Sequence, residues 1–433
     1  MTILATQIEH ELRSRSVPNL PRHFVLPHYD GYSIANIAPT IAKVLNVNLE
    51  DAVPPLPSNL WSDMAADVEC VILLLLDAVG YLQLRRYVAT ETSIFTRLAL
   101  EGRLLPITSV FPSTTVTALT SIWTGQAPLG HGFVGTKLLL PGQGVLANLL
   151  KMAPAGYPGA GKLVDWGWEP EKFVTVSSLA QQLGSAGIQT MAHTRRHFIG
   201  STLTRIFLRG MSDLQGYIDL SDLWINLRHA LTRRRAGERL FVDVYWSGAD
   251  NAGHVYGTEN EYVPSALRHF GRSFEEDFLS ILAPEARENT LLMIAADHGQ
   301  IATPAEHIVR LPDHPRLQEA LLLPPAGESR AAYLYERPGQ KGTVAAYIKE
   351  HLAKHFVALD TERALETGLW GEAQEVTPAT RVRLGDMILV ARESSRLSTR
   401  EEEEDKSPLR GHHGSLTPQE MLVPLLMVRL DEL

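Results

Sequence analysis

Three nearly continuous apolar runs dominate the hydrophobic pattern of this chain. They cover residues 68–76 (VECVILLLL), 238–246 (ERLFVDVYW) and 289–296 (NTLLMIAA). Apolar side chains on successive positions are typical of strands buried on both faces, as in a parallel sheet covered by helices. Stretches with helical character lie between them, for example 176–187 and 221–237. The alternation predicts an α/β fold with a mostly parallel central sheet sandwiched by helices.

A second, smaller pattern lies in the C-terminal half. Within 328–395 the segments AAYLYE, KGTVAAYIKEHLAKH, FVALDT and RLGDMILVAR follow one another. A strand, an amphipathic helix and two more strands indicate an α+β subdomain, which we place at 310–395 as an insertion. Segment 137–170 is rich in Gly, Pro and Leu, shows few strand signals and is expected to lead into a cap. At 433 residues, one large domain with an insertion is the expected organisation.

Composition narrows the class of protein. With 45% hydrophobic and 21% charged residues the chain has the profile of a globular enzyme, and its formal charge of −9 argues against a nucleic-acid polymer as partner. We expect no membrane partner and a cytoplasmic protein, because neither a secretory signal nor a run of about 20 apolar residues is evident. The single cysteine, Cys70, cannot form an internal disulfide, and EEEED at 401–405 is expected to be a solvated loop.

Acidic and histidine residues gather near the ends of the apolar runs. These residues are Asp77, Asp250, His254, Asp297, His298, His412 and His413. Ligands collect at the carboxyl ends of strands in such sheets, and carboxylates with imidazoles are typical ligands of divalent metals. Each motif alone also has a structural interpretation, such as a helix cap at Asp250 or a turn in which Gly299 supplies backbone freedom. Spacing alone does not separate His412 from His413.

The segment ITSVFPSTTVTALTSIWTGQAPLGHG supplies candidate nucleophiles, because it contains six threonines. A hydroxyl becomes an effective nucleophile when a base or a metal activates it. The alternative is a Thr-rich helix start preceded by Pro112 and Ser113.

Together these motifs resemble the alkaline phosphatase superfamily, in particular the type I phosphodiesterases and nucleotide pyrophosphatases. The order Asp, Thr, Asp-x-x-x-His, Asp-His, His matches from Asp77 to the C-terminus. The resemblance implies an alkaline phosphatase-like catalytic domain over 1–433. The family nucleophile stands ten positions before the Gly of a Ser-Ile-x-Thr-Gly string, which gives Thr115 here, with Thr114 as its competitor.

The resemblance also implies two divalent metal ions, zinc in the first place and manganese as the alternative. Asp77, Thr115, Asp297 and His298 would hold one ion, and Asp250, His254 and His413 the other. His413 is preferred over His412 because the family pattern is Gly-x-His-Gly.

Two departures concern the substrate end. The family has Phe-Pro-Asn after the nucleophile, where this chain has Val116, Thr117 and Ala118. The family's phosphate-binding Asn lies five residues after the His of a His-Gly pair; counting from His131, which we expect to be structural, gives Thr136. We therefore predict that Thr136 and its neighbour Lys137 bind the substrate.

The predicted function is hydrolysis of phosphodiester or pyrophosphate bonds in small nucleotide-type molecules, by in-line attack of Thr115. Alternatives within the superfamily are a phosphomonoesterase, a phosphomutase or a phosphonate hydrolase. Mutases of the group use Ser as nucleophile, and a sulfatase is disfavoured because Cys70 lies outside the Thr segment. A metal-binding protein without turnover is the alternative from another class. Basic side chains beside the metals would favour monoesters; the candidates are Lys137, Arg195, Arg196 and Arg330.

Overall fold

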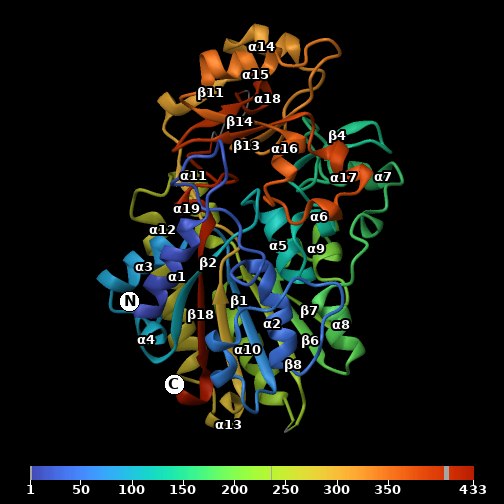
Figure 1. Cartoon of the computed structure of the whole chain (residues 1–433). Helices are drawn as coiled ribbons and strands as arrows, with labels where there is room; N and C mark the ends of the chain where they lie inside the picture. Colours follow the sequence, from blue (N-terminus) through green and yellow to red (C-terminus); the bar gives the residue numbers. More distant parts are fainter. Residues whose placement is uncertain (1, 236, 404–408) are drawn as a thin grey trace.

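A seven-stranded sheet forms the centre of the computed structural model, which describes residues 2–235, 237–403 and 409–433 (Figure 1). Its strand order is β2–β18–β9–β1–β8–β6–β7. The strands are β1 (Cys70–Leu76), β2 (Arg103–Thr108), β6 (Gln189–Arg195), β7 (Asp213–Tyr217), β8 (Leu240–Trp246), β9 (Thr290–Ala295) and β18 (Leu422–Arg429). All neighbours pair in parallel except β18, which is antiparallel to β2 and to β9. The expected mostly parallel sheet is confirmed.

The register of the three central strands aligns their carboxyl ends. Leu76 of β1 lies opposite Trp246 of β8, and Leu75 lies opposite Ala295 of β9. Every residue of β1 and β9 is buried, which explains the unbroken apolar runs in the sequence. The loops that follow these strands therefore leave the sheet at one edge.

Helices cover the sheet in two groups (Figure 1). Contacts link α3, α4, α10 and α12 in one group, and α2, α5, α8 and α9 in the other. Their bounds are α2 (Ile37–Val44), α3 (Tyr81–Thr90), α4 (Ile94–Glu101), α5 (Thr115–Thr124), α8 (Leu179–Ser185), α9 (Thr202–Phe207), α10 (Leu220–Arg233) and α12 (Tyr262–Ser273). Both helices expected from the sequence, at 176–187 and 221–237, are present as α8 and α10.

A second seven-stranded sheet lies beyond the carboxyl edge of the first, in the upper part of Figure 1. Its order is β14–β15–β13–β12–β3–β4–β5, and its strands pair antiparallel. The strands are β3 (Lys137–Leu140), β4 (Val145–Asn148), β5 (Ala153–Pro154), β12 (Ala326–Gly327), β13 (Ala331–Leu334), β14 (Phe356–Asp360) and β15 (Met387–Ala391). Segment 137–170 thus supplies three strands, although its sequence gave few strand signals.

Alternating side chains of the second sheet pack into two different cores. Along β15, Met387 and Leu389 join a small cluster with α14 (Pro315–Ala320) and α15 (Thr343–Tyr347), whereas Ile388 and Val390 join the main core. Strand β15 is therefore buried on both faces and anchors the second sheet on the central domain.

A buried ion pair adds a polar connection between the two sheets. Arg330, between β12 and β13, donates from Nε to Glu420 Oε1 at 2.7 Å and from Nη2 to Glu420 Oε2 at 2.8 Å. Both side chains are fully buried. Glu420 lies on α19 (Pro418–Met421), immediately before β18, so this pair fixes the second sheet to the chain entering the central sheet.

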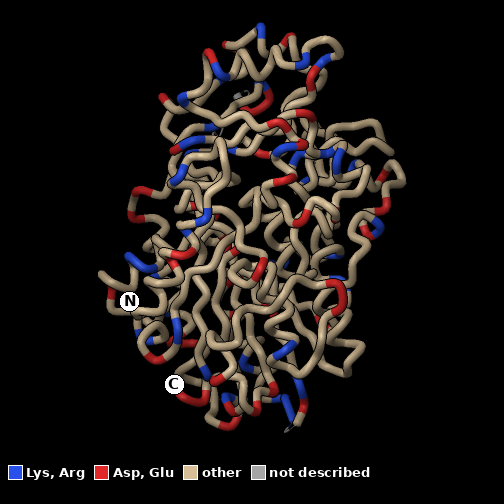
Figure 2. The backbone as a smooth tube through the Cα atoms, viewed as in Figure 1, with Lys and Arg blue, Asp and Glu red and all other residues tan. Residues whose placement is uncertain are grey.

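Lysine and arginine alternate with aspartate and glutamate over the molecule, without a large region of one sign (Figure 2). Within the described ranges, no helix combines the length and apolar character that crossing a bilayer requires.

Asp243 is an acidic residue within the otherwise apolar strand β8, and its side chain is buried. Burial raises the pKa of Asp243 to about 7, although the indole of Trp123 opposes the shift. An unfolded chain releases this proton near pH 4, so the folded state loses stability as the pH rises from about 4 to about 7.

We therefore expect Asp243→Asn to unfold with a higher free energy than the wild type at pH 8, by up to about 4 kcal/mol, and with a similar value at pH 4. Urea denaturation at both pH values measures the difference. Asp313→Asn on the surface is the control and should show no such pH-dependent gain. Equal curves for wild type and Asp243→Asn at pH 8 would contradict the prediction.

Candidate active site

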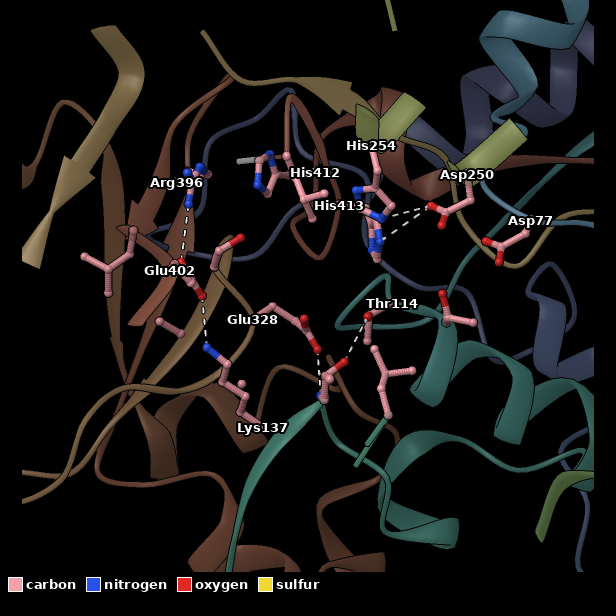
Figure 3. A pocket seen from close by; sticks show the side chains of 18 of the residues that line it. Asp77, Thr114, Lys137, Asp250, His254, Glu328, Arg396, Glu402, His412 and His413 are labelled. Atoms are coloured by element: carbon pink, nitrogen blue, oxygen red, sulfur yellow. Dashed lines mark hydrogen bonds and ion pairs between the residues drawn. The ribbon is translucent and has the colours of Figure 1, made fainter. Parts of the chain in front are cut away.

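A cavity of about 440 Å³ lies between the carboxyl edge of the central sheet and the second sheet. Asp77 and Asp250 line it from the central domain, and Lys137 and Glu328 line it from the second sheet (Figure 3). Thr115 also lines it, from the central domain. The side chains predicted from the sequence to act together therefore meet at one place.

The first cluster consists of Asp77, Asp297 and His298, whose ligand atoms lie within 4.8 Å of one another. Asp77 directly follows β1, and one residue, Ala296, separates Asp297 from the end of β9. Nε2 of His298 is 3.6 Å from Asp77 Oδ1 and 3.4 Å from Asp297 Oδ2. The hydroxyl oxygen of Thr115 lies 3.1 Å from the same nitrogen. Four residues from three segments that are far apart in the sequence therefore converge on one point.

The second cluster consists of Asp250, His254 and His413, whose ligand atoms also lie within 4.8 Å of one another. Asp250 and His254 are four residues apart on α11 (Gly248–Tyr256), so they lie on one face of the helix. Nε2 of His254 is 3.1 Å from Asp250 Oδ1, and Nε2 of His413 is 3.9 Å from it. Gln300 donates to the same carboxylate oxygen at 3.0 Å and so helps to fix it.

A short pair of strands places His413, which belongs to the second cluster, beside the first cluster. β17 (Gly411–His412) pairs antiparallel with β10 (Ile301–Ala302), just after His298. The His413 ring stacks on that of His298, with 3.8 Å between the ring centroids. The two clusters are therefore adjacent.

The three histidines of these clusters share one orientation. Nδ1 of each lies near a backbone carbonyl oxygen: Gly299 at 3.1 Å for His298, Gly411 at 2.7 Å for His254 and Ser113 at 3.0 Å for His413. A proton on Nδ1 leaves the Nε2 lone pair directed at the carboxylates, as in histidines that bind metals. His412 differs, because its Nδ1 is 2.6 Å from Thr303 Oγ1.

The carboxylates have the environment that a cation would complete. Asp77 Oδ1 and Asp297 Oδ2 are buried and accept no hydrogen bond within the described residues. Burial, and then repulsion from Asp297 and Asp250, raises the pKa of Asp77 well above its ordinary value. Orphaned carboxylate oxygens among imidazole nitrogens form a donor set suited to a divalent metal.

Position 299 is a glycine because the backbone of another segment passes very close to it. The sequence had suggested instead that this glycine supplies freedom for a turn. Its φ lies outside the left-handed region, but a Cβ here would be 1.9 Å from the carbonyl oxygen of Gln419. The strained residue is Ala78, which follows Asp77 with a φ of 60°. Its N–H donates to Asp297 Oδ1 at 3.1 Å, so the turn after β1 orients the carboxylate that follows β9.

Thr115 and Thr114 both line the cavity, at the start of α5. Thr114 is the N-cap residue and Thr115 the first residue of the helix, where backbone N–H groups lack intrahelical acceptors and favour anions. Thr114 Oγ1 is 3.4 Å from Thr136 Oγ1, and only Thr115 is hydrogen-bonded to His298. Of the two threonines, Thr115 is therefore the one in contact with the first cluster.

Thr136 and Lys137 line the cavity and contact acidic side chains from distant segments. The Thr136 N–H donates to Glu328 Oε1 at 2.6 Å, and Lys137 Nζ donates to Glu402 Oε1 at 2.9 Å. Glu402 Oε2 also accepts from Arg396 at 3.3 Å. Glu402 lies on α18 (Arg400–Glu403) and is thus paired within the cavity rather than solvated, whereas residues 404–405 of the acidic run lie outside the described residues.

Three further residues of the cavity have no signal in the sequence: Glu328, Arg396 and Glu402. They come from a turn, from the three-residue strand β16 (Arg396–Ser398) and from the short helix α18, which are too short for a periodic pattern. Of the basic candidates, Lys137 lines the cavity, Arg330 is held by Glu420, and Arg195 lies over the ring of Tyr217. His131 is buried, accepts a hydrogen bond from the N–H of Phe133 and lies 2.9 Å from Ser121 Oγ.

Comparison with known proteins gives one family and several similar structures. The family model of type I phosphodiesterase / nucleotide pyrophosphatase matches residues 71–416. No curated protein sequence matches the chain significantly.

Among solved structures, murine ectonucleotide pyrophosphatase/phosphodiesterase 5 superimposes with a TM-score of 0.63 at 17% identity, over 82% of this chain and 87% of that one. An inactive variant of the same murine protein, in complex with AMP, superimposes with a TM-score of 0.61 at 16% identity and with the same coverage. Phosphonoacetate hydrolase from Sinorhizobium meliloti 1021, in complex with phosphonoformate, superimposes with a TM-score of 0.59 at 18% identity, over 84% of this chain and 94% of that one.

The fold and the match together define a hydrolase of phosphoric esters within the alkaline phosphatase superfamily. More specifically, the chain belongs to the type I phosphodiesterase / nucleotide pyrophosphatase family.

The neighbouring histidines of the GHHG motif should differ in metal binding. We expect His413→Ala to lower the zinc content of the purified protein from about two ions per chain to about one, because one Nε2 ligand of the second cluster is lost. His412→Ala is the matched control and should keep both ions. Elemental analysis after zinc loading and desalting measures the content. An equal loss in both variants would contradict the assignment of His413.

Proposed function

We propose that the protein hydrolyses phosphodiester or pyrophosphate bonds of small nucleotide-type molecules, with Thr115 as the nucleophile and two divalent metal ions as cofactors. The observation that carries the proposal is the Thr115 hydroxyl beside His298 Nε2, at the junction of two clusters of carboxylates and imidazoles. A hydroxyl in this environment is one that can be activated for attack.

Asp77, Asp297, His298 and Thr115 would hold one ion, and Asp250, His254 and His413 the other. Two divalent ions would lower the pKa of the nucleophile and neutralise charge that develops on phosphoryl oxygens. Zinc suits a donor set rich in imidazole, and manganese is the alternative because two of the first cluster's residues are aspartates.

Thr115 attacks phosphorus in line with the bond to the leaving group. The leaving group departs with the hydroxyl proton as the alcohol or phosphate, and threonine is esterified to a phosphoryl group that keeps its second substituent. Water then attacks this intermediate from the vacated side, releases the phosphorylated product and restores the hydroxyl. The start of α5 orients the nucleophile, and its free N–H groups favour the negative phosphoryl oxygens. The hydroxyls of Thr114 and Thr136, which face each other, are available as donors to the same oxygens.

The remaining walls of the cavity favour a small substrate with an organic group. Phe198 and Tyr245 line it, with 6.2 Å between their ring centroids, and offer aromatic surface to a base. Tyr245 also donates its hydroxyl proton to Asp77 Oδ2, which fixes that ring. The AMP bound to the murine relative is in keeping with a nucleotide-type substrate.

Phosphonate hydrolysis is the second candidate. The fold similarity to phosphonoacetate hydrolase and the cationic groups of Lys137 and Arg396 in the cavity favour it. A screen of diesters, pyrophosphates, monoesters and phosphonates with zinc and manganese separates the two candidates.

Replacement of the nucleophile tests the proposal directly. We expect Thr115→Ala to lose at least about 10³-fold of kcat/KM on bis-p-nitrophenyl phosphate, because no hydroxyl remains to attack. Thr114→Ala is the adjacent comparison and should lose far less activity, because it removes one hydroxyl donor to the phosphoryl oxygens and leaves the nucleophile in place. Steady-state kinetics measure the loss, and mass spectrometry of acid-quenched reactions should detect a p-nitrophenyl phosphoryl group on Thr115. Full activity of Thr115→Ala would overturn the proposal.

A further inference from the structure

Glu328 is an acidic residue of the cavity that belongs to neither metal-ligating cluster. It lies in the turn between β12 and β13 of the second sheet. Figure 3 shows its carboxylate across the cavity from Asp250 and His413, on the side of Thr114. An anion on this wall affects any phosphate that enters.

Hydrogen bonds connect Glu328 to the nucleophile segment. Its Oε1 accepts the N–H of Thr136 at 2.6 Å, and Thr136 Oγ1 lies 3.4 Å from Thr114 Oγ1, next to Thr115. The carboxylate thus borders the phosphate end of the site rather than its outer rim.

Packing also fixes the position of Glu328. A Cβ on Gly414 would lie 3.0 Å from Cβ of Glu328, so the residue after His413 packs directly against it. Two residues later, Arg330 is held by the buried pair with Glu420. The carboxylate cannot move far from the site without disturbing these contacts.

Only part of the charge of Glu328 is balanced. Burial raises the pKa of Glu328 to about 7, while the hydrogen bond from Thr136 and the charge of Lys137 lower it. The Lys137 ammonium is hydrogen-bonded to Glu402 rather than to Glu328. At alkaline pH the site therefore contains a carboxylate beside the place of the phosphate.

We propose that Glu328 is a specificity-determining residue that disfavours dianionic phosphomonoesters and thereby favours substrates whose reacting phosphate carries one negative charge. The proposal rests on the proposed function. A phosphomonoester has a second ionisation near pH 6 and carries about two charges above it, whereas a diester carries one. Repulsion by a fixed anion therefore acts more strongly on the monoester, and such repulsive elements are a general source of specificity.

This role gives a physical meaning to Thr136, the position at which the chain departs from the family's Asn. The backbone N–H of Thr136 is used by Glu328, so the phosphate end offers hydroxyl donors together with an acceptor carboxylate. That combination suits a monoanion better than a dianion.

The test compares diester and monoester hydrolysis by the full chain at pH 9, where the carboxyl group and the monoester are ionised. We expect Glu328→Gln to lower the ratio of kcat/KM for bis-p-nitrophenyl phosphate to that for p-nitrophenyl phosphate by about tenfold. Glu401→Gln is the matched control, because Glu401 also accepts one backbone N–H, from Gly156 at 2.9 Å, but does not line the cavity. Its ratio should stay at the wild-type value.

Two further measurements keep the outcome decisive. Inorganic phosphate, titrated calorimetrically at pH 9, should bind Glu328→Gln more tightly than wild type by a similar factor. Glu328→Asp retains the charge and should keep the wild-type ratio.

An unchanged ratio and unchanged phosphate affinity in Glu328→Gln would overturn the inference, as would a ratio that falls equally in Glu328→Asp. A wild-type protein that cleaves neither ester would instead overturn the proposed function, and the phosphate titration would still test Glu328.

Discussion

The buried ion pair between Arg330 and Glu420 is the interaction on which the arrangement of the site depends. Its two charges are removed from water, which is tolerable only because Ser415 and Thr417 donate to the carboxylate while backbone carbonyls accept from the guanidinium. Loss of one partner would leave an unpaired buried charge. Because the pair joins the turn that carries Glu328 to the segment that follows His413, it sets the width of the cavity between the two sheets.

On the side of the cavity that the central sheet forms, the main constraint is the close approach of several negative charges. Parallel register delivers Asp77 and Asp297 to one edge, and α11 adds Asp250 beside them. Burial and repulsion between the carboxylates raise the pKa of Asp77, and burial raises the pKa of Asp297, so a nearby cation would stabilise their ionised forms. The central sheet therefore builds a site that a divalent cation would complete, while the second sheet supplies Thr136, Lys137 and Glu328 to the same cavity.

The sequence predicts the central wall well and the second wall poorly, for physical reasons. Strands such as β1 are recognisable because every position is apolar, and the acids that follow them stand out against that background. The strands β3 and β4 are short and partly exposed, so their pattern is weak. Glu328 meets Thr136 across 192 residues of sequence, in a turn with no periodicity. No local signal marks such a contact, because only the assembled second sheet creates it.

The antiparallel strand β18 has a consequence for how the chain is made. It lies between β2 and β9, and within the described residues it is the only strand of the central sheet that β2 pairs with along its length. During synthesis from the N-terminus, β2 cannot pair with its neighbouring strand until residues 422–429 have been made. From the synthesis of β2 until that of β18, a nascent chain therefore exposes an unpaired strand edge, which is the period in which such edges recruit other chains.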